Sequence, residues 1–108
     1  MARWIVEVID AAERELRSLP GDVQARFLHV AEMLEEAGPA DAGMPHVRHL
    51  EGKLWEMRLR GRDGIARAIY FANAGRKLTV VRVFAKKTQA TPRREIDLAL
   101  QRMSERMK

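Results

Sequence analysis

The chain contains no cysteine, so disulfides and thiolate chemistry are excluded. It also lacks a long hydrophobic run, because no window approaches the roughly 18 consecutive apolar residues that a membrane span needs. Residues 1–15 contain acids too early, and too short an apolar run, for a secretory signal. These absences predict a cytoplasmic protein with no membrane partner.

Histidine is scarce as well. His46 and His49 lie three residues apart in a segment rich in glycine and proline, without cysteine or acidic residues at metal-ligand spacing. His29 flanks the apolar stripe of a predicted helix. The sequence therefore predicts neither a metal site nor a cofactor. A role for His49 near a bound ligand stays open, because this residue directly precedes the predicted strands.

The charge of the chain is unevenly distributed. Residues 1–52 carry five arginines and ten acids, a net charge of −5, whereas residues 53–108 carry fifteen Lys and Arg against five acids, a net charge of +10. Such asymmetry within one small domain favours an anionic partner surface, with nucleic acid as the leading candidate. A surface that is charged only for solubility is the alternative.

Residues 53–91 contain three runs with the composition of β-strands, separated by two turns with glycine at 61–64 and 73–76. In the first run, apolar residues at 55, 57 and 59 alternate with Glu56, Arg58 and Arg60. This alternation is typical of a strand with one buried and one solvated face. The runs at 65–71 and 77–85 complete a predicted antiparallel sheet.

Helical patterns precede and follow these strands. A short strand over 3–8 leads into a helix that Asp10 caps, and a second helix begins with Asp22 as its cap. Residues 38–52 have the composition of a loop, and Thr91 and Pro92 begin a last helix. The predicted fold is therefore α+β, a single domain over 1–108 in the order β-α-α-β-β-β-α. It has a mainly antiparallel sheet with the helical hairpin packed on one face. The second helix carries an apolar stripe toward that sheet: Val23, Phe27, Val30, Ala31 and Leu34.

Three segments resemble the RelE/ParE toxin superfamily, most closely its HigB-like, phage-derived Gp49-like branch: HLEGKLWEMRLRG at 49–61, RAIYF at 67–71 and VRVFAKKTQATPRREIDLALQRM at 81–103. The most specific part is the pattern F-x-K-K-T-x-x-T-P-x-x-E-I-x-x-A, here Phe84 to Ala99. The resemblance covers nearly the whole chain and implies a RelE-like fold.

The resemblance also implies a toxin of a type II toxin–antitoxin system. Members of this branch typically cleave mRNA during its translation on the ribosome, and a small helix-turn-helix antitoxin of the HigA type neutralises them. Operator DNA is then bound only through the antitoxin, because no recognition helix is evident in this chain. The acids of the two N-terminal helices are expected to form their solvated surface, with contact to basic residues of the antitoxin as the alternative: Glu13, Glu15, Glu32, Glu35 and Glu36.

Cleavage of RNA without a metal uses the neighbouring 2′-hydroxyl as the nucleophile. The site must accept a proton, stabilise charge on the phosphoryl oxygens and protonate the leaving oxygen. Arg67 is the first candidate for the phosphate, because it is the only charge in an apolar strand and matches the arginine of the family's R-x-x-Y strand. The alternative is an Arg67 that pairs with Glu56 across the sheet.

Other basic residues complete the predicted site. Arg58, a further catalytic candidate, shares a strand face with Arg60 at a spacing of about 7 Å, which suits adjacent phosphates. Arg82 and the catalytic candidate Lys86 have the same parity on the last strand. The remaining predicted RNA-binding residues are Lys53, Lys87 and Arg93. For each of these residues taken singly, the alternative role is a solvated charge at a strand edge, where it prevents aggregation.

The residue that transfers protons is not determined by the sequence. Several relatives carry a Tyr or His near the C-terminus, and this chain has neither there. Glu56 is one candidate base, with a salt bridge to Arg58 or Arg67 as its competing role. Lys86 or Lys87 is another. Tyr70 lies by parity on the opposite face from Arg67, so it is predicted to belong to the core.

Three functions remain open at this point. The first is a ribosome-dependent mRNA endonuclease, and the second is a ParE-like toxin that inhibits DNA gyrase by binding it. The third is a nucleic-acid-binding relative without catalysis. Clustered cations favour the first over the second, because a pure protein–protein inhibitor has no need to hold phosphates. The missing C-terminal Tyr or His keeps the third open.

Overall fold

The computed structural model describes residues 3–38, 46–86 and 90–107, and the side chain of Lys86 lies outside the described part. Among these residues, no helix has both the length and the apolar character that crossing a lipid bilayer requires. The elements follow one another as β1 (Ile5–Val8), α1 (Asp10–Arg17), α2 (Gly21–Ala37), β2 (Val47–Glu51), β3 (Leu54–Gly61), β4 (Gly64–Asn73), β5 (Lys77–Lys86) and α3 (Arg93–Arg106).

The strands form one five-stranded sheet in the order β1-β5-β4-β3-β2. β1 is parallel to β5, and every other neighbouring pair is antiparallel. β3 and β4 are joined by a hairpin in which Gly61 pairs with Gly64, and a second turn, with Gly75 at φ 76°, joins β4 to β5. The predicted α+β class, the mainly antiparallel sheet and both hairpins are therefore confirmed.

The strand β2 was not predicted, because residues 38–52 have the composition of a loop. Only two of its five residues, Val47 and Leu50, are apolar, and glycine or proline flanks it on both sides. Its pairing with β3 also shifts register between His49 and Glu51. So short and irregular a strand carries no clear period-2 pattern. The tertiary pairing with β3 therefore defines it more than its own sequence does.

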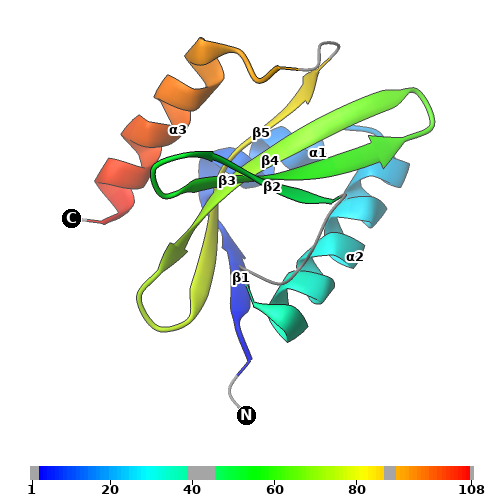
Figure 1. The fold of residues 1–108 in the computed structure, drawn as a ribbon. Coiled ribbons are helices and arrows are strands. Elements are labelled where there is room, and N and C mark those ends of the chain that lie inside the picture. Colours follow the sequence, from blue (N-terminus) through cyan, green and yellow to red (C-terminus); the bar gives the residue numbers. More distant parts are fainter. Residues whose placement is uncertain (1–2, 39–45, 87–89, 108) are drawn as a thin grey trace.

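The helical hairpin covers one face of the sheet, with α2 against β3 and α1 against β5 (Figure 1). The predicted stripe of α2 is buried and packs on Met57, Leu59 and Tyr70. Burying each large apolar side chain contributes roughly 1.5–3 kcal/mol, so this contact is a main source of stability. The predicted placement of the hairpin is confirmed.

The two N-terminal helices do not begin as predicted. Ile9 and Pro20 occupy the N-cap positions, and neither helix has a side-chain cap. The carboxylate of Asp22 instead accepts a hydrogen bond of 2.5 Å from the backbone N–H of Arg62. This bond lowers the pKa of Asp22. Asp22 thus ties α2 to the turn between β3 and β4, where the sequence predicted only a helix cap.

The opposite face of the sheet is covered over part of its area by α3. Leu54, Ile69 and Phe71 are fully buried there in a second apolar cluster that includes residues of α3. Toward the other end of the strands, Arg60 is exposed and Arg58 is half-buried. The prediction of one wholly solvated face is therefore wrong at the covered end, and the cations lie where that cover ends.

Candidate functional site

Backbone pairing brings three of the predicted site residues together. Arg58 on β3 pairs with Arg67 on β4, and one row further along Arg60 pairs with Ile65, which pairs with Lys86. Paired residues of neighbouring strands point to the same face of a sheet. Arg58, Arg60 and Arg67 therefore share the face that α3 partly covers. The sequence could not fix this register.

Glu56 lies beside them on the same face and is fully buried. Its carboxylate accepts a hydrogen bond of 3.1 Å from Nε of Arg48, and the hydroxyl of Thr91 lies 3.0 Å from it. Nε of Arg67 lies 3.1 Å from its other oxygen. The predicted alternative of an Arg67–Glu56 ion pair is confirmed, whereas Arg58 is not its partner. Thr91 was predicted as a helix cap, but Pro92 holds that position and Thr91 contacts Glu56.

Arg67 is a buried cation with unused hydrogen-bond donors. Its side chain is 4% exposed. Nε is close to Glu56 but is not aligned for a hydrogen bond, and neither Nε nor Nη1 has a partner among the described residues. Burial lowers the pKa of Arg67, the charge of Glu56 opposes that shift, and Arg58 and Arg48 add to it. Because a guanidinium stays protonated at any physiological pH, Arg67 keeps a fixed positive charge directly across from Arg58 on the neighbouring strand.

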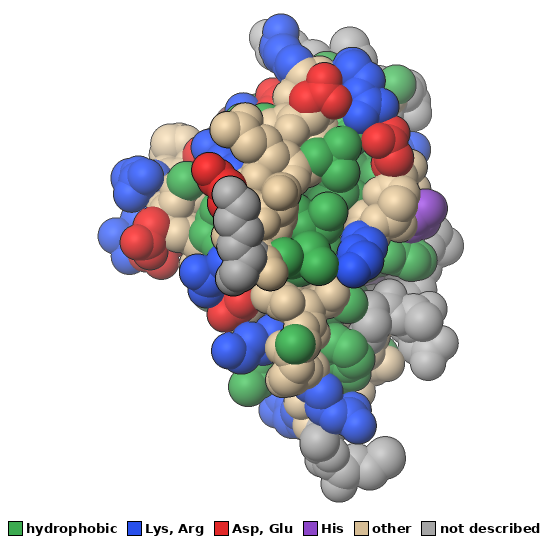
Figure 2. All heavy atoms as spheres, turned by 90° about the vertical axis from the view of Figure 1, so that its left-hand side faces the viewer, with side chains coloured by type: hydrophobic (Ala, Val, Ile, Leu, Met, Phe, Trp, Pro, Cys, Tyr) green, Lys and Arg blue, Asp and Glu red, His purple; other side chains and the backbone are tan. Residues whose placement is uncertain are grey.

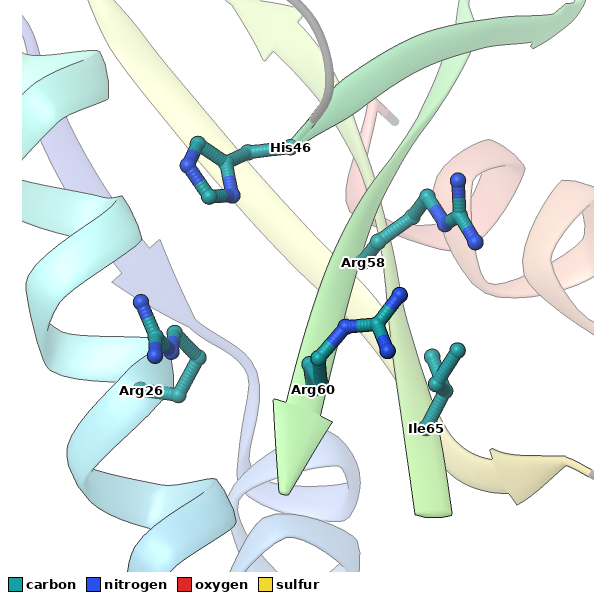
Figure 3. A pocket seen from close by; sticks show the side chains of 5 residues that line it. All are labelled: Arg26, His46, Arg58, Arg60 and Ile65. Atoms are coloured by element: carbon teal, nitrogen blue, oxygen red, sulfur yellow. The ribbon is translucent and has the colours of Figure 1, made fainter. Parts of the chain in front are cut away.

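A pocket of about 120 Å³ lies at the end of β3, next to paired Arg58 and Arg67. It is lined by Arg26, His46, Arg58, Arg60 and Ile65 (Figure 3). Arg58 donates a backbone hydrogen bond of 2.7 Å to the carbonyl oxygen of His46, which fixes His46 beside β3. Sequence reasoning missed both Arg26 and His46. Arg26 lies on a helix in the acidic half of the chain, and His46 lies in a segment without strand periodicity.

Arg82 is held by carboxylates from two helices. Its guanidinium donates to Glu95 at 2.7 Å and to Glu15 at 2.5 Å, and Arg102 also donates to Glu15. The hydrogen bond with Glu95, followed by the charge of Glu15, raises the pKa of Arg82. Arg82 therefore joins α1 and α3 to β5. The expectation that Glu15 belongs to a solvated surface is wrong, and contact of Arg82 with RNA stays a prediction without geometric support.

The remaining predicted residues lie away from the pocket or outside the described part. Arg93 donates to both carboxylate oxygens of Glu51, at 2.7 and 3.0 Å, and these bonds raise the pKa of Arg93. Lys53 is exposed just before β3, at the end opposite Arg60. The backbone of Lys86 ends β5. The side chain of Lys86 and all of Lys87 lie outside the described residues, so their roles stay predictions.

Ion pairing distinguishes the pocket from the rest of the surface. Nine of the fifteen arginines have a carboxylate of a described residue within 4.0 Å. Positive and negative side chains are interspersed on the side of the molecule that carries α3 (Figure 2). Three of the six arginines without such a partner among the described residues line the pocket. These six are Arg14, Arg26, Arg58, Arg60, Arg62 and Arg76.

The described residues contain no group of three or more His, Cys, Asp or Glu placed to hold a metal ion. In the comparison with protein families, the model of the phage-derived protein Gp49-like family matches residues 14–104. The chain belongs to this family. Together with the structural relatives, this confirms the resemblance to the RelE superfamily of toxins. Curated protein sequences include no match to the chain.

Solved structures of toxins have the same fold as this Gp49-like chain. A double arginine-to-alanine mutant of the Escherichia coli toxin RelE in the free state has a TM-score of 0.71 at 17% identity, covering 94% of this chain and 98% of that one. The archaeal RelE–RelB complex from Pyrococcus horikoshii has a TM-score of 0.60 at 26% identity, covering 82% and 100%. The toxin–antitoxin complex RelBE2 from Mycobacterium tuberculosis has a TM-score of 0.57 at 19% identity, covering 78% and 99%.

Proposed function

We propose that this Gp49-like protein is the HigB-like toxin of a type II toxin–antitoxin system and a metal-independent endoribonuclease that cleaves ribosome-bound mRNA and so inhibits translation. One observation carries the proposal. Arg58 and Arg67 are paired on one face of the sheet, and Arg67 is a buried guanidinium with donors that no described residue uses. A phosphodiester is the anion in RNA that two such forks bind.

In the proposed reaction, the 2′-hydroxyl of RNA attacks the adjacent phosphorus. Arg58 and Arg67 stabilise the negative charge that develops on the phosphoryl oxygens, a type of interaction that contributes mainly in the transition state. The 2′-oxygen loses its proton to a base, and the leaving 5′-oxygen gains one. The products are a 2′,3′-cyclic phosphate and a 5′-hydroxyl.

Glu56 takes a positioning role in this mechanism. Its carboxylate is in contact with Arg48, Arg67 and Thr91 and is fully buried. An oxygen held in this way is poorly placed to receive a proton from a bound ribose, because proton transfer requires direct contact or one bridging water. Lys86, at the end of β5, stays the proposed base. Glu56 instead fixes the guanidinium of Arg67.

The proposed partners follow from the same assignment. A small helix-turn-helix antitoxin of the HigA type binds the toxin, and operator DNA is contacted only through that antitoxin. Two of the structural relatives were solved as complexes of RelE-type toxins with antitoxins, which supports an antitoxin partner. The proposed site of action is the translating ribosome, and hence the cytoplasm.

The test is inducible expression in bacteria, with growth curves and mapping of mRNA 5′ ends. The wild type is expected to arrest growth and to produce new 5′ ends within translated frames. Arg58→Ala is expected to lower the cleavage rate on the order of 100-fold, the usual cost of removing one transition-state donor. Arg62→Ala is the matched control, because Arg62 is exposed and lies in the neighbouring turn. Arg67→Lys, which keeps the buried charge, complements these variants.

Two outcomes would replace the proposal. Arrest with intact mRNA and altered DNA supercoiling would indicate a ParE-like inhibitor of gyrase. A wild-type protein without toxicity, but with RNA affinity, would indicate a binding protein without catalysis. Equal cleavage by the wild type and by Arg58→Ala would remove the assigned role of Arg58.

A further inference from the structure

The pocket lies beyond the end of the pairing between β2 and β3. β2 pairs with β3 from Leu54 to Met57, and among the described residues the one backbone contact of this edge beyond that point is the bond from Arg58 to His46. Arg58 and Arg60 extend from β3 to one side of this edge (Figure 3). Arg26, from α2, and His46 lie on the other side.

Among the residues that the structure describes, no carboxylate lines this pocket. Arg26, Arg58 and Arg60 have no ion-pair partner among the described residues, although Glu and Asp neutralise most other arginines of the chain. Like charges that gather without counter-charges repel one another and raise the local potential. That arrangement stabilises nothing in the free protein, but it favours an anion that contacts several of these residues together.

Protection of the strand edge does not account for this set. Charged side chains on an edge strand oppose aggregation, and exposed Arg60 already supplies one. Arg26 is half-buried and belongs to a helix, so it has no part in edge protection. The pocket gathers cationic and imidazole groups from three separate segments.

We propose that Arg26 and His46 bind a second phosphate of the RNA strand, next to the phosphate held by Arg58 and Arg67. The strand then passes around the edge of β3 beyond Arg58, and Arg60 lies between the two positions. This proposal rests on the proposed function for its ligand, single-stranded RNA. It adds a subsite on the α2 side of the sheet and makes α2 part of the RNA-binding surface.

The experiment measures the affinity of the purified protein for fully 2′-O-methylated oligoribonucleotides, which cannot be cleaved. A dinucleotide, with a single phosphate, is compared with an octanucleotide over about 50 to 200 mM salt. The variants are Arg26→Ala, His46→Ala and, as the matched control, Arg14→Ala. Arg14 is an exposed arginine of α1 without an ion-pair partner among the described residues. Circular dichroism and thermal unfolding verify that each variant is folded.

Arg26→Ala is expected to weaken binding of the octanucleotide roughly tenfold and to reduce the salt slope by about 0.7, the value for one phosphate contact in a single strand. Binding of the dinucleotide should not change, because one phosphate occupies the Arg58–Arg67 position. His46→Ala should show the same length dependence, and Arg14→Ala should bind like the wild type.

The proposal is overturned if Arg26→Ala binds the octanucleotide with wild-type affinity and slope, or if Arg14→Ala loses as much. It is also overturned if Arg26→Ala impairs binding of an antitoxin while RNA binding is intact. The probe needs no catalysis, so the two proposals fail separately. A wild-type protein that binds the octanucleotide but cuts no mRNA refutes the nuclease alone. If the wild type cuts mRNA, and Arg26→Ala binds RNA and cuts mRNA equally well, the subsite alone is refuted.

Discussion

Arg67 and Glu56 show how a charged pair is kept inside the sheet. Two arginines share the single carboxylate of fully buried Glu56: Arg67, which is buried, and Arg48, whose side chain is 44% exposed. Desolvation of such charges costs several kcal/mol per ion, and mutual attraction offsets it only where each partner is present. Buried Arg67 therefore depends on Glu56 as its counter-charge.

Removing the charge of Glu56 should therefore cost stability. Glu56→Gln leaves Arg67 buried without a counter-charge, and the free energy of unfolding should fall by about 3–5 kcal/mol. Urea titration followed by circular dichroism measures it. The double variant Glu56→Leu/Arg67→Met should lose less than the sum of Glu56→Leu and Arg67→Met, because it removes both charges. Additive losses would show that the pair is not coupled.

Replacing Tyr70 with phenylalanine should stabilise the protein. Its side chain is fully buried, and its hydroxyl has no hydrogen-bond partner among the described residues. A buried unsatisfied group costs roughly 1–3 kcal/mol, so Tyr70→Phe should raise the free energy of unfolding by about 1 kcal/mol, within that penalty. Urea titration at neutral pH checks the sign. A decrease would mean that the hydroxyl has a partner, such as an ordered water.

The same residue predicts a pH dependence. Burial raises the pKa of Tyr70 above its ordinary value. A group whose pKa is raised by folding favours the folded state at low pH, and this contribution is lost as pH rises above the unfolded-state pKa of about 10. The chain contains no other tyrosine. The advantage of Tyr70→Phe over the wild type should therefore grow above about pH 10, and unfolding curves at increasing pH measure that difference.

At the scale of single residues, the sequence predicted well which face of a strand a side chain points to, but it predicted poorly which residues pair with each other. Alternation along single strands was sufficient to place Arg58 with Arg60 and to assign Tyr70 to the core. Arg67 and Arg82 look alike in sequence, each a lone arginine in an apolar run. They differ in the structure because carboxylates of distant segments, Glu15 and Glu95, reach only Arg82. Such long-range pairing cannot be read from a local pattern.

At the scale of elements, the contact of α2 with β3 places Arg26 next to the cations of the sheet. Gly61 permits this contact, because a Cβ at that position would lie 2.6 Å from Cγ2 of Val23 and 3.1 Å from the carboxylate of Asp22. The distance of 2.6 Å is shorter than atoms in contact allow, so a side chain at Gly61 must displace Val23 of α2.

Gly61→Ala should therefore destabilise the protein by about 1–3 kcal/mol through overpacking. Gly21→Ala is the control, because nothing lies within 4 Å of a Cβ there and the residue begins a helix. Adding Val23→Ala to Gly61→Ala should recover part of the loss, although Val23→Ala alone is destabilising. Thermal unfolding of the four proteins measures these effects. A double variant that loses the full sum of both would contradict the proposed clash.

The missed strand β2 shows why part of the site could not be predicted. β2 contains Arg48, an ion-pair partner of Glu56, and His46 directly precedes the strand. β2 therefore borders the pocket. Its sequence has too few apolar residues for a period-2 pattern. The elements with long, regular patterns were predicted, and those defined by pairing with a neighbour were not.

At the scale of the whole molecule, the uneven charge of the sequence is partly compensated by folding. Four basic residues of the second half pair with acids of the first: Arg82 and Arg102 with Glu15, Arg93 with Glu51, and Arg106 with Glu7. The net charge of the second half therefore overstates its attraction for anions. What folding leaves uncompensated is local, and the pocket at the end of β3 holds much of it.

This difference between total and local charge can be tested with two variants of equal charge. Arg60→Ala and Lys53→Ala each remove one exposed cation near an end of β3, but only Arg60 lines the pocket. Arg60→Ala should weaken binding of the 2′-O-methylated octanucleotide and reduce the salt slope by about 0.7, whereas Lys53→Ala should change neither. Equal losses in the two variants would mean that RNA responds to the overall charge of +5. The arrangement of unpaired arginines would then no longer explain where RNA binds, because a diffuse field attracts a phosphate chain without fixing its position.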